Sequence, residues 1–201
     1  MHLSRRKFIV CASAAGTACG LTALIANGDA SPSYVWRGSA LGGEARVALY
    51  GADKEAAANA LADVAHEIER LENIFSLHRD DSELSRLNAQ GQLVGASRDL
   101  IEVLRAAAAW RAKTGGAFNP LVQPLWRAAA RAEEISQSML DAAQGHIAIS
   151  NEIGLPSRSA VTLNGIAQGR IADRVTELLL SHGFDNVVID AGELRLPGRE
   201  P

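Results

Sequence analysis

The pattern of apolar and polar residues changes along the chain, and these changes predict where strands and helices lie. Residues 34–51, "YVWRGSALGGEARVALYG", alternate and are rich in aromatic and β-branched residues, which predicts two strands broken at Gly42 and Gly43. From Asp53 the apolar residues recur at steps of three and four, as on one face of a helix. The residues of this predicted core face are Leu61, Val64, Ile68, Leu71 and Phe75. Glu69 and Glu72 are expected on its solvated face.

The next stretch is polar, and its serines indicate where two further helices begin. In "SLHRDDSELSRLN", residues 76–88, we expect a loop and then a short helix capped by Ser82. Asp81 suits the positive end of that helix better than it suits a metal site. Ser97 is placed to cap a helix from 98 to 113. The residues expected to face inward on it are Leu100, Val103, Leu104, Ala107 and Trp110.

The second half of the chain alternates less regularly. Two prolines in "AFNPLVQPLWRAAARAEE", residues 117–134, predict an extended, turn-rich segment before a weak helix near 136–143. Short strands are expected at 146–150 and 160–163, followed by a helix from about 168 to 181 and a buried strand at 186–192. The inward residues of that helix are Ile171, Val175, Leu178 and Leu179. Irregular alternation with the strands clustered late predicts an α+β fold.

Composition limits the possible function classes. The 201 residues are 47% hydrophobic and 21% charged, as in a folded globular protein that can bury its own core. The formal net charge of -3 shows no basic footprint, so nucleic acid is excluded as a partner.

The first thirty residues have the form of a twin-arginine signal peptide. Arg5 and Arg6 precede a weakly apolar stretch, and small residues before position 31 suit cleavage after Ala30. This predicts export by the twin-arginine machinery to the periplasm. An uncleaved anchor behind a coincidental arginine pair is the alternative, and a lipid on Cys19 is a minor option. Both cysteines lie in this segment, so residues 31–201 contain no disulfide.

The segment "TLNGIAQGRIADRV", residues 162–175, starts as a buried strand, passes two glycines and then takes a helical pattern. Without a Cβ, Gly165 and Gly169 would open the backbone at a helix N-terminus, where amide groups and the helix dipole attract phosphate. The glycines also suit a tight turn with no ligand, and the residues alone favour that interpretation.

Three motifs together resemble one family. "FSLHRDDSELSRLN" at 75–88, "TGGAFNPLVQPLW" at 114–126 and "NGIAQGRIADRV" at 164–175 occur in the order and spacing of the ApbE family, the FAD:protein FMN transferases. The resemblance extends from Arg37 to about Arg195. "RGSALGGEA", "NGIAQG", "DAGELR" and the twin-arginine start further resemble the NosX-type branch, which is associated with nitrous oxide reductase maturation in denitrification.

The resemblance implies an ApbE-like flavin transferase fold over residues 31–201, truncated at its C-terminus. The family's His-containing loop and its Asp/Thr segment, which carries metal ligands, do not occur in these residues. The implied reaction splits FAD with Mg²⁺, passes FMN to a Thr or Ser of an acceptor protein and releases AMP. For the NosX-type branch the implied acceptor is a NosR-like electron-transfer protein in the membrane or periplasm.

The resemblance also implies the site residues, whereas a catalytic residue stays unassigned. The expected flavin-binding residues are Arg37, His78, Ala117, Phe118, Asn119, Asn164 and Arg170. The carbonyl of Ala167 is the expected Mg²⁺ ligand. Several of these positions depart from the family pattern: Arg37 replaces a Met, His78 a common Tyr, Asn119 a common Asp and Arg170 an aromatic residue, while Gln168 stands where many members have Lys.

Two other functions stay open. A non-catalytic flavin-binding or carrier protein would need neither metal nor turnover. An FAD pyrophosphatase, which releases FMN and AMP, would need water in place of an acceptor protein.

Overall fold

The computed structural model describes residues 22–24, 33–150, 152–192 and 194–195. Most of the predicted signal peptide, residues 1–30, lies outside this described part. The helices are α1 (Lys54–Phe75), α2 (Glu83–Gln90), α3 (Arg98–Lys113), the 3₁₀ turn η1 (Pro120–Val122), α4 (Gln123–Ala130), α5 (Gln137–Gln144) and α6 (Asn164–Ser181). The strands are β1 (Thr22–Leu24), β2 (Ser33–Ala40), β3 (Gly43–Tyr50), β4 (Gln92–Val94), β5 (Ala148–Ile149), β6 (Glu152–Gly154), β7 (Val187–Asp190) and β8 (Leu194–Arg195).

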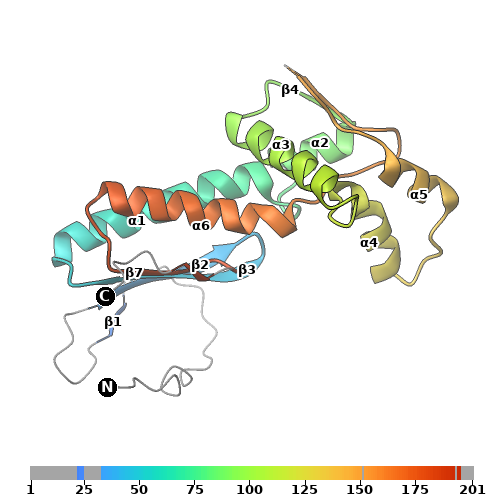
Figure 1. Cartoon of the computed structure of the whole chain (residues 1–201). Coiled ribbons are helices and arrows are strands. Elements are labelled where there is room, and N and C mark those ends of the chain that lie inside the picture. The colour runs from blue at the N-terminus through green and yellow to red at the C-terminus, as the bar shows by residue number, and fades with distance from the viewer. Residues whose placement is uncertain (1–21, 25–32, 151, 193, 196–201) are drawn as a thin grey trace.

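The larger sheet has the strand order β1-β2-β3-β7-β8, and every neighbouring pair is antiparallel. Helices α1 and α6 lie side by side on one face of it (Figure 1). Strand β7 follows α6 in sequence and pairs with β3, so residues late in the chain extend the sheet begun by the first hairpin. This mixed architecture confirms the predicted α+β class.

The predicted break between the first two strands is a two-residue turn. Ala40 pairs with Gly43, which leaves Leu41 and Gly42 between the strands. Both have positive φ, 53° and 83°, as in the primed turns that suit the twist of a hairpin. Gly42 accommodates this without cost, whereas Leu41 is a bulky residue in a left-handed conformation and is 8% exposed.

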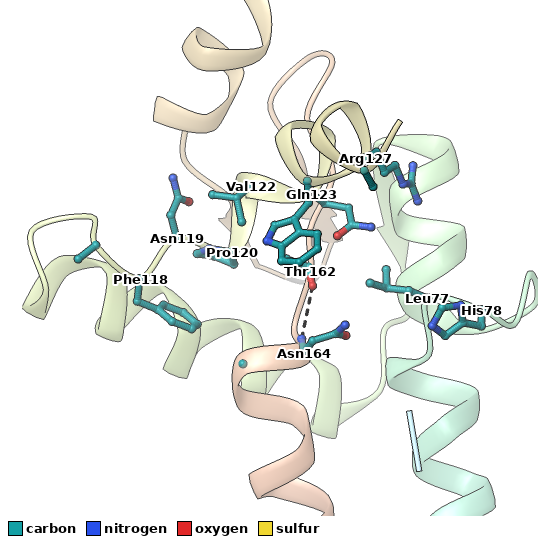
Figure 2. Close-up of a pocket in the computed structure, with 14 residues that line it drawn as sticks. Leu77, His78, Phe118, Asn119, Pro120, Val122, Gln123, Arg127, Thr162 and Asn164 are labelled. Carbon is teal, nitrogen blue, oxygen red and sulfur yellow. Dashed lines mark hydrogen bonds between the residues drawn. The ribbon is translucent and has the colours of Figure 1, made fainter. Parts of the chain in front are cut away.

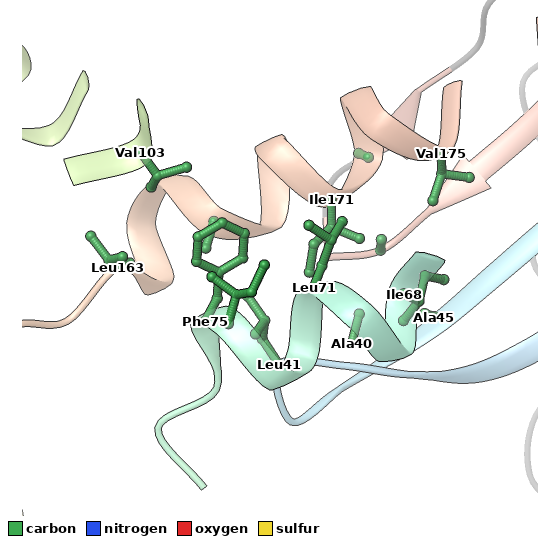
Figure 3. Packing of buried hydrophobic residues seen from close by; sticks show 14 of the residues in the cluster. Ala40, Leu41, Ala45, Ile68, Leu71, Phe75, Val103, Leu163, Ile171 and Val175 are labelled. Carbon is green, nitrogen blue, oxygen red and sulfur yellow. The ribbon is translucent and has the colours of Figure 1, made fainter. Parts of the chain in front are cut away.

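The hydrophobic core joins the sheet to α1 and α6. Figure 3 shows Ile68, Leu71 and Phe75 of α1 in one layer with Ile171 and Val175 of α6. The whole predicted core face of α1 is buried. Burial of each such side chain contributes roughly 1.5–3 kcal/mol relative to exposure, so this layer fixes α6 on the sheet.

A second group of elements lies beyond the ends of α1 and α6: α2, α3, α4, α5 and a small sheet of order β4-β6-β5 (Figure 1). The caps predicted at Ser82 and Ser97 are confirmed, since their hydroxyls accept from the amides of Ser85 and Leu100. Among the described residues, no helix combines the length and apolar character needed to cross a bilayer.

Several local predictions are wrong. Residues 123–130 form α4, because Pro124 sits in the first helical turn, where its missing N–H costs nothing. Residues 160–163 form no strand; Asn88 instead bonds both backbone groups of Val161 with its side chain. Trp110 is 52% exposed, in the last turn of α3, with the Lys113 ammonium 5.2 Å from its ring centroid.

Two further corrections bear on the site. Helix α6 begins at Asn164, so Gly165 and Gly169 lie inside its first turns and do not form a turn ahead of it. Glu72 is 7% exposed and is not on a solvated face.

Candidate functional site

A cavity of about 680 Å³ opens between the second group of elements and the start of α6. Figure 2 shows Phe118 and Asn119 on one side of it and Leu77 and His78 on the other. The lining residues are Leu77, His78, Ala117, Phe118, Asn119, Pro120, Val122, Gln123, Trp126, Arg127, Ala130, Thr162, Asn164 and Gly165. Five of the eight predicted site residues are therefore brought together: His78, Ala117, Phe118, Asn119 and Asn164.

Phe118 forms an aromatic wall that depends on the motif around residue 164. Its amide donates to Thr114 Oγ1 at 3.0 Å, which fixes the backbone just after the end of α3. A Cβ built on Gly165 would lie 3.2 Å from Phe118 Cε2, closer than most real Cβ contacts. The glycine therefore lets the ring rest against the first turn of α6.

The side chain of Asn119 is hydrogen-bonded to backbone groups around the cavity. Its Oδ1 accepts from the amide of Leu121 at 3.0 Å and so caps η1, while its Nδ2 donates to the carbonyl of Ala143 at 2.9 Å. Arg111 donates to the same carbonyl at 3.0 Å and also to that of Gly145. Together they fasten the end of α5. An amide side chain can both accept and donate in this way, whereas an ionised carboxylate can only accept, which gives a structural reason for Asn where the family commonly has Asp.

The N-terminus of α6 faces the cavity through Asn164 and Gly165. The amide of Asn164 meets Thr162 Oγ1 at the long distance of 3.5 Å, and no side chain caps the helix at Leu163. The positive end of the helix dipole thus lies at the wall, where it favours an anionic group.

His78 lines the opposite wall, in the loop after α1. Its amide donates to Ser76 Oγ at 3.1 Å. A Cβ on Gly42 would lie 3.3 Å from both His78 Cδ2 and His78 Nε2, so the imidazole ring rests on the turn of the first hairpin.

Helix α4 supplies four lining residues that the sequence analysis did not identify: Gln123, Trp126, Arg127 and Ala130. They were missed because residues 123–130 were not predicted to be helical. Proline near the first helical position is itself a helix-start signal and would have revealed α4. Trp126 is 68% exposed although it lines a cavity, and Arg127 brings a cation to the same wall.

Arg170 lies outside the cavity lining. It pairs through Nη2 with Asp99 Oδ1 at 3.1 Å and with Glu102 Oε2 at 3.0 Å, which ties α6 to α3. Burial raises the pKa of Asp99, but hydrogen bonds from Arg70 and Arg170 outweigh it and hold that pKa below its ordinary value. The positive charge of Arg170 is thus paired with carboxylates of α3.

Arg37 and Ala167 also lie apart from the cavity lining. Arg37 is exposed on β2, opposite Arg46 of β3. Ala167 is fully buried within α6, where a carbonyl is directed along the helix axis toward the amide four residues on. Among the described residues, no group of three or more His, Cys, Asp or Glu is placed to hold a metal ion. The described residues alone therefore do not supply the near-octahedral set of oxygen ligands that Mg²⁺ requires.

Comparisons with known proteins agree on one family. The model of the ApbE family matches residues 41–201. The chain is 32% identical over 153 residues to a FAD:protein FMN transferase of Treponema pallidum (strain Nichols), and the match covers 66% of this chain but 42% of that protein. The chain thus spans less than half of that curated relative.

Solved structures show the same fold. The flavin transferase ApbE from Vibrio cholerae matches with a TM-score of 0.70 and 25% identity, covering 85% of this chain and 60% of that one. The apo form of the Pseudomonas stutzeri flavinyl transferase ApbE matches with a TM-score of 0.71 and 23% identity, covering 88% and 64%. These matches confirm the predicted ApbE-like fold.

Proposed function

Because this chain belongs to the ApbE family, we propose that its cavity binds FAD and that the protein transfers FMN from FAD to a Thr or Ser hydroxyl of an acceptor protein. One observation carries the proposal: residues of three motifs, distant in sequence, meet around a single cavity of about 680 Å³. That volume lies within the usual range for sites of organic cofactors.

The lining suits the parts of a flavin dinucleotide. Phe118 and Trp126 offer ring faces for stacking on an aromatic system. Gln123 and Asn164 offer amides for the hydrogen-bonding edge of a heterocycle. Arg127 and the N-terminus of α6 offer positive charge for the pyrophosphate.

The charge distribution supports an anionic ligand on this side of the molecule. Residues 103–132 contain five basic residues and no acidic one, in a chain with a formal net charge of -3. The basic residues are Arg105, Arg111, Lys113, Arg127 and Arg131. Of these five, Arg127 lines the cavity, where its positive charge would lower the free energy of a bound anion.

In the proposed reaction the acceptor oxygen forms a bond to the phosphorus of the FMN half. The bond from that phosphorus to the bridging oxygen breaks, AMP leaves with the electron pair, and the hydroxyl proton passes to solvent or a base. Such transfers depend mostly on positioning and charge stabilisation. The cavity residues would hold the flavin and its phosphates in place. The described residues do not provide the Mg²⁺ site expected from the family, so no step here relies on that ion.

We further propose that residues 1–30 are a twin-arginine signal and that residues 31–201 are the transferase domain, working in the periplasm. The pair Arg5–Arg6 supports export, and the NosX-type motifs support a NosR-like electron-transfer acceptor and a role in nitrous oxide reductase maturation.

The test is to incubate the 201-residue chain with FAD, Mg²⁺ and a NosR-like flavin-acceptor domain, and to seek covalent FMN on that domain by mass spectrometry. An acceptor whose target Thr is changed to Val is the matched control. An FMN adduct on the parent acceptor alone supports transfer. FMN and AMP without an adduct would support the pyrophosphatase, and bound FAD that stays intact would support the carrier.

A further inference from the structure

Glu72 is a buried carboxylate behind the wall of the cavity. It lies in the last turn of α1 and is 7% exposed, although a carboxylate is rarely buried this deeply unless it is paired. Its side chain alone is 9% exposed, compared with 16% for Glu67 and 58% for Glu69 on the same helix. Burial of Glu72 therefore needs an explanation specific to its position.

Both carboxylate oxygens of Glu72 have partners from different parts of the chain. Oε1 accepts from the amide of Leu41, in the turn between β2 and β3. Oε2 accepts from Arg79 Nε at 3.0 Å, in the loop after α1. One side chain thus joins three segments: the hairpin turn, α1 and the loop that carries His78.

Of the three segments that Glu72 joins, the hairpin turn contains a non-glycine residue with positive φ. Leu41 has φ 53°, which is a left-handed conformation. This conformation is unfavourable in free energy for any L-residue that has a Cβ. Its side chain is buried in the core and its amide is held by Glu72. Strained residues of this kind persist where the surrounding contacts fix them.

The loop after α1 is fastened from the same side. Arg79 Nη1 and Nη2 pair with Glu69, and Nη1 also donates to Asn73 Oδ1 at 2.8 Å. The amides of His78 and Arg79 both donate to Ser76 Oγ. The backbone on both sides of the His78 side chain is therefore tied to α1.

The two segments that Glu72 joins meet again at the cavity. The His78 ring rests on Gly42, where an added Cβ would lie 3.3 Å from two ring atoms. A shift of the turn or of the loop would therefore move the imidazole that lines the cavity.

We propose that Glu72 is a positioning residue of the cavity: its buried carboxylate locks the Leu41–Gly42 turn to the Arg79 loop and so fixes His78 in the wall. That the cavity holds a flavin rests on the function proposed above, whereas the coupling of Glu72 to His78 does not. Glu72 acts only through these neighbours, because it does not line the cavity.

The experiment compares Glu72→Gln with Glu67→Gln in the 201-residue chain. The first substitution keeps the shape of the side chain but replaces one carboxylate oxygen by an NH₂ group. That group would face another hydrogen-bond donor, either the amide of Leu41 or the guanidinium of Arg79. The second is the matched control, since Glu67 pairs with Arg70 and Arg174 away from the cavity lining. The first readout is the set of His78 ring resonances in NMR spectra recorded without ligand, and the variant His78→Gln assigns them. The other two readouts are the Kd for FAD, measured by calorimetry, and the temperature of thermal unfolding.

For Glu72→Gln we expect shifted His78 resonances and a Kd for FAD raised about tenfold, as loss of a charge-assisted hydrogen bond would produce. Glu67→Gln should lower thermal stability with neither effect. Unchanged His78 resonances in folded Glu72→Gln, or equal effects in the two variants, would overturn the proposal. If Glu72→Gln does not fold, Arg79→Met replaces it, with the same expected shifts and the same disproof.

A parent chain that binds no FAD separates the two proposals. The calorimetric arm would then count against the flavin function, while the His78 resonances would still decide whether Glu72 positions the wall.

Discussion

Phe118 rests against Gly165 so closely that a Cβ on residue 165 would lie 3.2 Å from Phe118 Cε2. The two residues belong to motifs about fifty positions apart, and their contact forms the corner where the aromatic wall of the cavity meets the N-terminus of α6. The glycine at this position is thus explained by the space that the ring requires.

Gly165→Ala is expected to weaken FAD binding without loss of the fold. Alanine favours a helix over glycine by about 1 kcal/mol, which offsets the cost of a contact that the ring can relieve by moving a few tenths of an ångström. The free energy of unfolding should stay within about 1 kcal/mol of the parent, while calorimetry shows a higher Kd for FAD. In a Phe118→Ala background the same substitution should no longer change the Kd. An effect of equal size there would rule out the ring as the cause.

Asn119→Asp is expected to destabilise the protein even though Asp is the common residue of the family. The carboxylate still accepts from Leu121 but cannot donate to the carbonyl of Ala143. Leaving that contact unmade and placing an anion beside a carbonyl should lower the free energy of unfolding by about 1–3 kcal/mol. Urea unfolding at pH 7 measures this, and the loss should shrink at pH 4, since a protonated Asp can donate. A variant as stable as the parent would contradict the role assigned to the amide.

Arg170→Met is expected to lower stability and leave FAD affinity unchanged. The guanidinium is held by Asp99 and Glu102, at 3.1 and 3.0 Å, outside the lining of the cavity. Losing these partly buried pairs should cost about 1 kcal/mol of unfolding free energy. A large rise in the Kd for FAD would instead show that the arginine leaves its carboxylates to meet the ligand, as the family resemblance suggested. Lys113→Met is a control for the removal of one exposed positive charge.

Acid is expected to weaken the contact of α1 with α3 and α6. The hydrogen bond from Arg70 lowers the pKa of Glu67 despite the opposing effect of burial, and Arg174 lowers it further. The pKa of Glu67 in the folded protein lies below the ordinary value of 4.5. The ion pairs of Glu67 therefore contribute fully to the free energy of unfolding above pH 4.5, and this contribution is lost as the pH falls through the folded pKa. Asp99 behaves in the same way below its ordinary value of 3.8.

The measurement is the free energy of unfolding of parent and Glu67→Gln between pH 7 and pH 3. The parent should lose stability over that acid range more steeply than the variant, and the two curves should converge at low pH. Parallel curves would show that the ion pairs of Glu67 do not contribute to folding.

Elements with complete local signals were predictable from the sequence. The bounds of α3 follow from the Ser97 cap and the apolar period, and α1 follows from its long periodic face. Residues 160–163 form a short apolar run, which predicts a buried strand. In the structure this run is no strand, because the Asn88 side chain takes the hydrogen bonds of the Val161 backbone that a neighbouring strand would otherwise take. This prediction failed because Asn88 lies 73 positions away from Val161 in sequence, whereas α4 was missed although Pro124 gave a local signal for it.

The same reasoning applies to the site. His78, Phe118 and Asn164 were identified through motifs, and the structure brings all three to one cavity. The burial of Glu72 was not predictable, because it depends on a left-handed turn thirty-one residues earlier. Arg170 lies at a family site position, but it pairs with Asp99, which is 71 positions away in sequence and which no motif indicates.

Trp126 gives a direct optical test of where FAD binds. Of the three tryptophans in the chain, Trp36, Trp110 and Trp126, only the last lines the cavity. An isoalloxazine that stacks on its indole should quench the fluorescence of Trp126 most strongly, with a smaller loss from the other two by energy transfer. Trp126→Phe should therefore remove the largest part of the FAD-dependent quenching and raise the Kd a few-fold. Trp110→Phe, on the exposed end of α3, should do neither. If Trp110→Phe removed the larger part, FAD would bind at the C-terminal end of α3, and the proposed cavity would be wrong.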